Sequence, residues 1–312
     1  MPRPIMSEFQ SMTSIDGLIQ PTATAAVPVM DRGFLYGDSI YEVFRTYDGV
    51  PLFYEEHWKR FQNSADLIHL RLQYSMEDIG AEVKRTVKAS GAVEAKRDVY
   101  VRYVVTRGEG ALGLLPDAKA NQRLIVIVMA VPEWNQEFYS SGVSLAISRT
   151  RRNEPHTLDP NIKGGNYLNN VMGVIEAREQ GADDSLMLDS ADFITEASNS
   201  NVFFVRNNEV LTPSQVSANL KGITKESVRQ ICVAGGIPYR EAELALDDLL
   251  AADECFITSA TREIMPVRKV LLGDGRSRDF PAGGGPQTRT VASLYRQFVR
   301  DYVENHQHYS MY

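Results

Sequence analysis

Residues 161–167 read Asn-Ile-Lys-Gly-Gly-Asn-Tyr, and the one lysine of this stretch, Lys163, stands between a short apolar residue and two glycines. A helix is predicted directly after it, over 166–180. Because glycine has no side chain, Gly164 and Gly165 let the backbone approach a ligand closely. A lysine amine that is desolvated in such a place can form a Schiff base. The ordinary alternative is a surface lysine at a turn.

Two other segments and one arginine carry polar groups that could bind a cofactor. In 194–203, ITEASNSNVF, Glu196 either keeps a pyridine nitrogen protonated or is a loop carboxylate. The stretch 220–224, LKGIT, opens a helix whose N–H groups and dipole suit a phosphate, or is an ordinary N-cap. Arg60, on a helix with an apolar face, either clamps a phosphate or is solvated. A Schiff-base lysine, a pyridinium carboxylate and a phosphate site together describe one cofactor, pyridoxal 5′-phosphate.

Several other kinds of active site have no support in the sequence. It contains no G-x-x-x-x-G-K-[ST] and no G-x-G-x-x-G between a strand and a helix, so nucleotide-binding folds lack their motifs. It also contains no H-E-x-x-H and no G-x-S-x-G. We therefore expect no metal site and no serine hydrolase.

Composition narrows the partners further. The 312 residues carry a net charge of −7, which disfavours nucleic acid and anionic membrane surfaces as partners. Cys232 and Cys255 have no metal-type spacing and lie among apolar residues, as reduced core thiols do. The longest apolar run, 124–131, is too short to span a bilayer, and the N-terminus lacks a signal-peptide core. We expect a cytoplasmic protein.

Hydrophobic periodicity and turn residues predict a mixture of helices and strands. The predicted strands are 41–47, 50–53, 99–106, 124–131, one starting at 143, 185–188, 201–206, 210–212, 254–258 and 264–271, and the predicted helices are 54–70, 75–90, 166–180, 224–234 and 286–302. The strands 99–106 and 124–131 are near-continuously apolar, which predicts burial on both faces. We expect a smaller N-terminal α/β domain over 1–131, a linker over 132–141 and a larger, cofactor-binding domain over 142–312. The last eight residues, NHQHYSMY, are expected to fray.

The order and spacing of these segments resemble the class IV aminotransferases of fold type IV. The resemblance covers about 29–298 and rests on the segments DRGFLYGDSIYEVFRTYDG, EHWKRFQNSA, IKGGNYLNNVMG, ITEASNSNVF, LKGIT, TSATREIMPV and GPQT. It implies an α/β fold of the D-amino acid aminotransferase type, α+β with two domains and the cofactor between them. It also implies pyridoxal 5′-phosphate as cofactor and a homodimer whose partner helps to close each site.

The resemblance also implies roles for individual residues. Lys163 matches the lysine that forms the internal aldimine and moves the proton between the substrate Cα and cofactor C4′. Glu196 matches the carboxylate at the pyridine nitrogen, and Tyr167 matches the tyrosine near the ring hydroxyl. The phosphate matches are Arg60, Ile223 and Thr224.

One position departs from the family pattern. The family usually has a phosphate-binding threonine three residues before the glutamate of E-[IV]-x-P-V, and that position is Ala260 here. Ser259 or Thr261 can take the role through a small shift, and we assign it to Thr261. Ala260 is expected to face the substrate.

Besides Ala260, four residues are expected to recognise the substrate. Tyr100 and Arg102 match the pair that seats carboxylates in branched-chain aminotransferases, and an arginine inside the apolar run VYVRYVV is costly without a partner. Tyr36 and Tyr41 match aromatic residues that line the pocket. Asp48-Gly49 predicts a two-residue hairpin between the strands 41–47 and 50–53, and core packing in that hairpin is an equal explanation for Tyr41.

The substrate motifs point in two directions. The loop 108–116 resembles the branched-chain type and lacks the Arg and His of D-amino acid aminotransferases, whereas YEVFRTY and EASNSNVF resemble the D-amino acid type. The leading hypothesis is transfer from a branched-chain or hydrophobic L-amino acid to 2-oxoglutarate by a ping-pong mechanism. The alternatives are a D-amino acid or (R)-selective amine transaminase, an aminodeoxychorismate lyase, and a binding protein on this fold.

Overall fold

The computed structural model describes residues 9–117 and 120–312. The chain folds into two compact units. The first unit comprises Met1–Pro132, Ile162–Asn166 and Arg300–Tyr312, and the second comprises Glu133–Asn161 and Tyr167–Val299. The short lysine-bearing segment therefore belongs to the first unit, although the chain on both sides of it belongs to the second.

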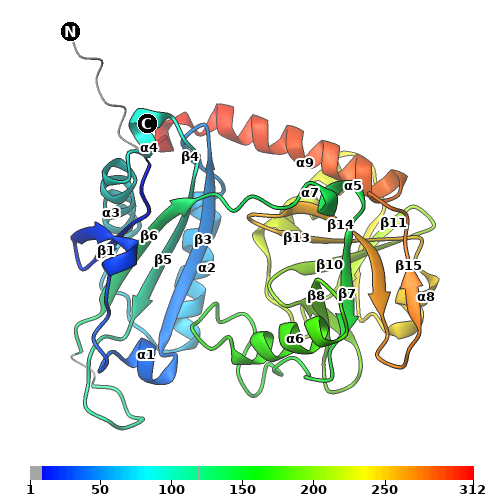
Figure 1. Ribbon diagram of the computed structural model, residues 1–312, viewed down its shortest axis with the longest axis horizontal. Coiled ribbons are helices and arrows are strands. Elements are labelled where there is room, and N and C mark those ends of the chain that lie inside the picture. The colour runs from blue at the N-terminus through cyan, green and yellow to red at the C-terminus, as the bar shows by residue number, and fades with distance from the viewer. Residues whose placement is uncertain (1–8, 118–119) are drawn as a thin grey trace. The chain divides into compact units, whose positions relative to one another are not determined.

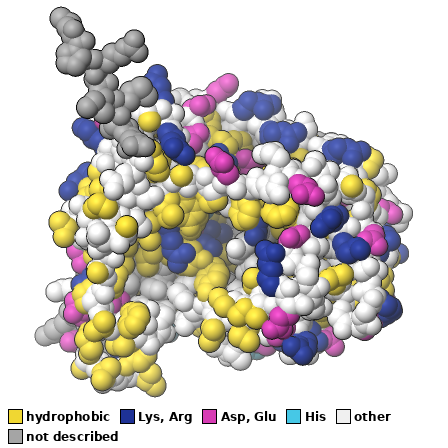
Figure 2. Space-filling model, viewed as in Figure 1, with side chains coloured by type: hydrophobic (Ala, Val, Ile, Leu, Met, Phe, Trp, Pro, Cys, Tyr) yellow, Lys and Arg dark blue, Asp and Glu magenta, His cyan; other side chains and the backbone are white. Residues whose placement is uncertain are grey.

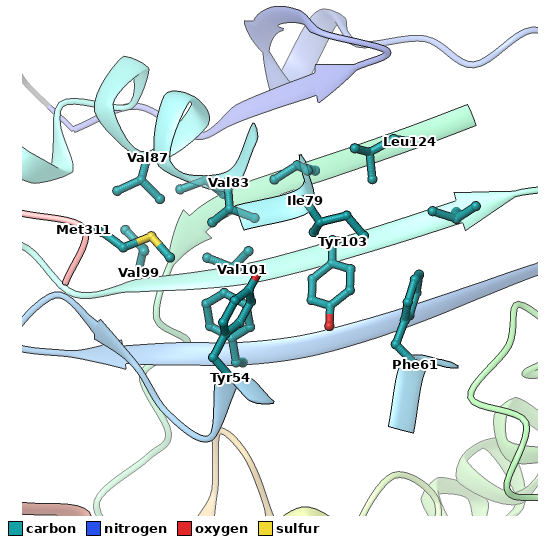
Figure 3. Close-up of a cluster of buried hydrophobic side chains, with 14 of the residues drawn as sticks. Tyr54, Phe61, Ile79, Val83, Val87, Val99, Val101, Tyr103, Leu124 and Met311 are labelled. Carbon is teal, nitrogen blue, oxygen red and sulfur yellow. The ribbon is translucent and has the colours of Figure 1, made fainter. Parts of the chain in front are cut away.

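The first unit is built on a six-stranded antiparallel sheet of order β2-β1-β6-β5-β3-β4, with helices packed on it (Figure 1). Its strands are β1 (Met12–Ile15), β2 (Leu18–Pro21), β3 (Ser39–Tyr47), β4 (Val50–Pro51), β5 (Val99–Thr106) and β6 (Arg123–Ala130). Its helices are η1 (Thr22–Thr24), α1 (Arg32–Tyr36), α2 (Tyr54–Leu67), α3 (Met76–Ala89), α4 (Ala92–Ala95) and η2 (Gln307–Tyr309). Phe61, Ile79, Val101 and Tyr103 are among the buried side chains that fill the core between α2, α3 and the sheet (Figure 3).

Local sequence signals place these elements. Asp48 and Gly49 both have positive φ angles, 49° and 77°, which is the conformation that Asp-Gly favours in a two-residue hairpin. This confirms the predicted β3–β4 hairpin. Ser75 and Asp78 form a capping box at the start of α3, where the sequence predicts the helix 75–90 to begin.

The prediction that strands β5 and β6 are buried on both faces is wrong. In β5, buried residues alternate with half-buried ones. The residues on the core face are Val99, Val101, Tyr103 and Val105. The helices that contact these strands cover only this core face. The opposite face, which carries Tyr100 and Arg102, stays half-buried, as is common for antiparallel sheets.

The C-terminal segment is ordered, so the prediction that it frays is also wrong. The Met311 side chain is 8% exposed and belongs to the core of the first unit. The Met311 N–H donates to the Gly49 carbonyl at 2.9 Å, and the Tyr309 hydroxyl donates to Glu55 at 2.6 Å. These contacts are made by residues far from the tail in sequence, which local composition does not reveal.

The second unit contains a mixed nine-stranded sheet of order β12-β11-β10-β13-β14-β7-β8-β9, with β15 paired to β14 (Figure 1). Its strands are β7 (Val143–Ile147), β8 (Asp184–Leu188), β9 (Ile194–Ala197), β10 (Asn201–Arg206), β11 (Glu209–Pro213), β12 (Tyr239–Ala242), β13 (Glu254–Ser259), β14 (Glu263–Leu271) and β15 (Ser277–Asp279). Its helices are α5 (Glu137–Ser140), α6 (Leu168–Glu179), α7 (Ile223–Ala234) and α8 (Leu246–Ala251), and α9 (Pro286–Asn305) ends within the first unit. Across the described residues, we find no helix both long enough and apolar enough to cross a membrane.

Candidate active site

Lys163 is held against the edge of β3 by backbone hydrogen bonds. The Tyr41 N–H donates to the Lys163 carbonyl at 2.8 Å, and the Gly165 N–H donates to the Ser39 carbonyl at 3.0 Å. A Cβ at Gly164 would lie 2.9 Å from the Ser39 carbonyl oxygen, and one at Gly165 would lie 2.6 Å from the Ser39 hydroxyl. The two glycines are therefore required because the segment runs so close to β3.

The Lys163 amine lies beside the ring of Tyr41. Its Nζ is 3.5 Å from the Tyr41 hydroxyl and 4.7 Å from the ring centroid. The guanidinium carbon of Arg102 lies 3.7 Å from the same centroid. Two cations thus share one aromatic ring, an arrangement that electrostatic attraction to the ring supports. Tyr41 is buried, and besides its packing in the hairpin its ring contacts both Lys163 and Arg102.

The strand register explains why Arg102 reaches Tyr41. Val43 is opposite Arg102 and Val104 is opposite Tyr41 in the antiparallel β3–β5 pair. Side chains two residues apart share a face, so Tyr100 and Arg102 lie on the same face as Tyr41.

Tyr36 makes different contacts within the first unit. Its hydroxyl accepts a hydrogen bond from the Gly113 N–H at 3.1 Å, and the Arg32 guanidinium lies 4.8 Å from its ring centroid. The structure therefore brings Tyr41, Arg102 and Lys163 together, and places Tyr36 against the loop that contains Gly113.

Arg60 forms a two-pronged ion pair with Glu42. Its Nε and one terminal nitrogen each donate to a different Glu42 oxygen at 2.7 Å, and Nδ1 of His57 lies 2.7 Å from the same carboxylate. Burial acts to raise the pKa of Glu42, but Arg60 and His57 outweigh it and hold that pKa well below its usual value. Burial lowers the pKa of His57 despite the neighbouring Glu42. The side chain that holds the predicted phosphate arginine is therefore a buried carboxylate.

Sequence reasoning missed Glu42 and His57. A glutamate within the apolar strand YEVF, on the face opposite Tyr41, was one available signal, because a buried carboxylate needs a cation. His57 and Arg60 are three residues apart on α2, so they share a helix face and can reach the same partner.

In the second unit, Glu196 on β9 is buried and accepts two hydrogen bonds from the protein. Its Oε1 accepts from Nε of Arg152 at 2.8 Å, and its Oε2 accepts from the Leu220 N–H at 3.1 Å. Arg152 also approaches the side-chain oxygens of Asn169 and Asn170, at 3.3 and 3.5 Å. Sequence reasoning missed Arg152, because it lies in an irregular segment 44 residues from Glu196.

Helix α7 starts directly after the loop whose Leu220 N–H donates to Glu196. Gly222 is its N-cap, and a Cβ there would lie 1.9 Å from Oδ1 of Asn201, so only glycine fits. The first N–H groups of a helix have no acceptor within the helix. Ile223 and Thr224 supply such groups, and among the described residues no side chain caps this end. This helix start is thus able to bind an anion.

The turn between β13 and β14 is fixed by Arg262. The Arg262 guanidinium lies 3.3 Å from the Asp184 carboxylate and 4.6 Å from the Trp134 ring centroid, and it donates to Asn199 and Ser200. Burial lowers the pKa of Arg262, against the opposite effect of Asp184.

Two hydroxyl-bearing residues of this turn have defined contacts. The Ser259 hydroxyl oxygen accepts from the Arg262 N–H at 3.2 Å, and the Thr261 carbonyl accepts from Trp134 Nε1 at 3.1 Å. The Thr258 hydroxyl oxygen is buried and has no hydrogen-bond partner among the described residues. Ala260 lies between Ser259 and Thr261. Tyr167, which directly precedes α6, is half-buried.

Comparison with known proteins places these features in a family. Residues 39–270 match the family described as Amino-transferase class IV. A putative branched-chain-amino-acid aminotransferase of Methanocaldococcus jannaschii is 35% identical over 262 residues, covering 84% of this chain and 88% of that protein. A D-alanine aminotransferase of Bacillus licheniformis is 32% identical over 290 residues, covering 91% and 95%.

A solved structure agrees with the sequence matches. The branched-chain aminotransferase of the thermophilic archaeon Thermoproteus uzoniensis, solved with norvaline, superposes with a TM-score of 0.85 at 28% identity, covering 96% of this chain and 99% of that one. The chain therefore belongs to the class IV aminotransferases and is an aminotransferase with the α+β two-domain architecture of fold type IV. This confirms the family and the fold class predicted from the sequence motifs.

Proposed function

We propose that the enzyme uses pyridoxal 5′-phosphate to move an amino group from a branched-chain or other hydrophobic L-amino acid to 2-oxoglutarate, in the two half-reactions of a ping-pong cycle. The observation that carries this proposal is the pair of cations on Tyr41, Arg102 at 3.7 Å and Lys163 at 4.7 Å from the ring centroid. Lys163 supplies the amine, and Arg102 supplies a fixed positive charge for a substrate carboxylate nearby. When bound, the cofactor supplies an electron-withdrawing ring that stabilises negative charge at the substrate Cα.

The residues of the chain fit this cofactor. Glu196 accepts two hydrogen bonds from the protein, and a carboxylate has about four acceptor sites, so it has capacity to hold a protonated ring nitrogen. The N–H groups of Ile223 and Thr224 suit a phosphate. The unpaired Thr258 hydroxyl lies near the end of β13, two residues before Ala260, the position where the family usually has a phosphate-binding threonine. We assign the phosphate contact of the turn between β13 and β14 to Thr261, with Ser259 as the alternative.

The remaining roles follow from the same proposal. Lys163 would hold the cofactor covalently in the resting enzyme, and its amine, once displaced by the amine of the substrate, would carry the proton that leaves the substrate Cα. Arg60 binds the phosphate through a guanidinium that Glu42 holds in place by Nε and one terminal nitrogen. Tyr167 contacts the ring hydroxyl.

Tyr100, Arg102, Tyr36 and Tyr41 form the substrate side of the proposed site, together with Ala260. Arg102 on a half-buried sheet face can pair with the carboxylate of 2-oxoglutarate or L-glutamate, and aromatic rings accommodate an apolar side chain in the other half-reaction. The similarity to the putative branched-chain-amino-acid aminotransferase of Methanocaldococcus jannaschii supports the choice of donor.

A second candidate is a D-amino acid or (R)-selective amine transaminase. The D-alanine aminotransferase of Bacillus licheniformis and the motif YEVFRTY support it. Donor stereochemistry separates the two candidates. A third, aminodeoxychorismate lyase, differs because pyruvate is released without an acceptor.

We also propose a homodimer. Near α1 and the loop after β5, large apolar side chains lie on the surface of the first unit, where Figure 2 shows hydrophobic atoms gathered at the lower left. They include Phe34, Leu112, Leu114 and Leu115, which are 71%, 74%, 83% and 91% exposed. Exposed apolar patches of this kind mark interaction sites, and a second copy of the chain is the proposed occupant.

Chemical trapping tests the cofactor proposal. Protein loaded with pyridoxal 5′-phosphate is reduced with borohydride, digested and examined by mass spectrometry. We expect the phosphopyridoxyl mass on the peptide that contains Lys163, and transamination of L-leucine with 2-oxoglutarate by unreduced protein. Lys163→Ala should lose both. Labelling of other lysines alone, or full turnover by Lys163→Ala, would contradict the proposal.

A further inference from the structure

Lys225 is a buried lysine in the first turn of α7, only 5% exposed. Its Nζ donates to the Pro213 carbonyl and to Oδ1 of Asn219, and it lies 3.6 Å from the Glu241 carboxylate. Burial lowers the pKa of Lys225, while the charges of Glu241 and Glu196 act in the opposite direction. A buried ammonium that is hydrogen-bonded in this way is costly to disturb, because its partners would lose their donor.

Asn219 completes a closed network inside the loop 214–222. Its Nδ2 donates to the carbonyls of Ser214 and Ser217, both at 2.7 Å, while its Oδ1 accepts from Lys225. One side chain thus ties the start of the loop to its end, and Lys225 ties that side chain to the helix.

Leu220, the residue after Asn219, connects this network to Glu196. The Leu220 N–H donates to Oε2 of Glu196 at 3.1 Å, and its carbonyl accepts from Nδ2 of Asn201 at 2.9 Å. Ile223 follows three residues later, at the start of α7. A shift of the loop therefore moves both a hydrogen bond to Glu196 and the N–H groups at the helix start.

We infer that Lys225 is a positioning residue that locks the loop 214–222 through Asn219. The lock keeps the Leu220 N–H hydrogen-bonded to Glu196, and it keeps the first N–H groups of α7 aligned for a phosphate. The identity of the ligand rests on the proposed function, but the lock itself does not. Lys225 acts through Asn219 and the backbone and contacts no substrate.

Two measurements on the full chain test the lock. The first is the Kd of the apoprotein for pyridoxal 5′-phosphate, from quenching of tryptophan fluorescence. The second is hydrogen exchange of peptides that cover 214–224, measured without and with the cofactor. For Lys225→Met, we expect at least a tenfold rise in Kd and faster exchange in 214–224, with no change in peptides covering β13 and β14. Lys225→Arg keeps a cation and should restore most of both signals.

A double-mutant cycle tests the route through Asn219. Asn219→Ala should weaken cofactor binding by a similar factor, and Lys225→Met/Asn219→Ala should be no weaker than either single variant, because both break the same link. Glu241→Gln is the matched control. The Glu241 side chain is 26% exposed, so water can replace its carboxylate, and the contacts of Lys225 with Pro213 and Asn219 remain. Its Kd and its exchange in 214–224 should therefore resemble those of the unaltered protein.

Each outcome is decisive. Unchanged Kd and unchanged exchange in Lys225→Met, or additive effects in the double variant, would overturn the lock. If Lys225→Met exchanges rapidly throughout the chain, Asn219→Ala alone decides, because it leaves the buried charge in place. If the unaltered protein fails to bind pyridoxal 5′-phosphate, the proposed function fails, while exchange of 214–224 in the apoprotein still tests Lys225.

Discussion

Nζ of Lys163 lies 3.5 Å from the hydroxyl of Tyr41 and 4.7 Å from the centroid of its ring. The backbones of the two residues are also joined, since the Tyr41 N–H donates to the Lys163 carbonyl at 2.8 Å. Strand β3 therefore contacts Lys163, the residue proposed for catalysis, at both its backbone and its side-chain amine. This contact is the basis of the first prediction.

Tyr41→Phe removes the hydroxyl near Lys163 but keeps the ring that lies against Arg102. We expect kcat to fall about tenfold, equivalent to about 1.4 kcal/mol of barrier, with KM nearly unchanged. Tyr41→Ala also removes the ring and should raise KM as well, because Arg102 loses its support. Steady-state kinetics with L-leucine and 2-oxoglutarate check both variants, and equal kinetics for Tyr41→Phe and the unaltered enzyme would refute a role for the hydroxyl.

Arg102→Met should separate the two half-reactions. A neutral side chain of similar length cannot pair with a second carboxylate, so we expect the KM for 2-oxoglutarate to rise by at least tenfold, about 1.4 kcal/mol or more. The KM for L-leucine should change less. Arg276→Met, which alters a residue with an exposed guanidinium, is the control. Equal losses for both substrates would mean that Arg102 supports the fold and does not select the acceptor.

Glu42→Gln breaks a buried ion pair and leaves Arg60 and His57 without their anion. Loss of one partner from such a pair costs about 3–5 kcal/mol, so the free energy of unfolding should fall by that order. Urea unfolding at pH 7 measures it. A loss below about 1 kcal/mol would show that water replaces the carboxylate without cost.

The same carboxylate predicts a pH dependence. Because the pKa of Glu42 is lowered by folding, its stabilisation is present above the unfolded value of 4.5 and is lost as the pH falls below it. The unaltered protein should therefore lose more stability than Glu42→Gln between pH 5.5 and pH 3.5. Equal losses in urea unfolding at these two values would contradict the lowered pKa.

Thr261→Ala should weaken cofactor binding if Thr261 supplies the phosphate contact of its turn. We expect the Kd for pyridoxal 5′-phosphate to rise about five- to tenfold, the loss of one charge-assisted hydrogen bond. Ser259→Ala tests the alternative residue in the same titration. A change confined to Ser259→Ala would reassign the contact.

Met311→Ala tests the docking of the C-terminal segment. Truncation of a buried methionine typically costs about 2–5 kcal/mol, and the lower end is expected so close to the chain end. Chemical denaturation measures the change, with the exposed Gln307→Ala as control. A destabilisation no larger than that of the control would mean that the segment contributes nothing to the core.

Local signals in the sequence predicted much of the secondary structure. The Asp48-Gly49 turn and the helix start at Ser75 depend only on residues close by in the chain, so the local sequence predicts them. The position of Lys163 depends on pairing with β3, more than 120 residues earlier, and no local pattern predicts that. Met311 was misjudged for the same reason, because its burial depends on residues near Gly49.

The candidate site shows the same division. Sequence motifs selected Lys163 and Glu196, whose neighbours are glycines and small polar residues in a recognisable order. The partners Glu42 and Arg152 were not selected, because the oppositely charged residue with which each one pairs lies in another segment of the chain. The roles of both residues stay predictions, and Lys163→Ala tests the first of them.

The most direct test is a panel of half-reactions on protein loaded with pyridoxal 5′-phosphate. The visible absorbance of the bound cofactor is followed after addition of L-leucine, L-glutamate, D-alanine or (R)-1-phenylethylamine. We expect rapid bleaching by L-leucine and L-glutamate, reversed by 2-oxoglutarate, and none in Lys163→Ala. Rapid bleaching by D-alanine or the amine, with little from L-leucine, would contradict the proposed donor and favour the D-amino acid or (R)-amine alternative.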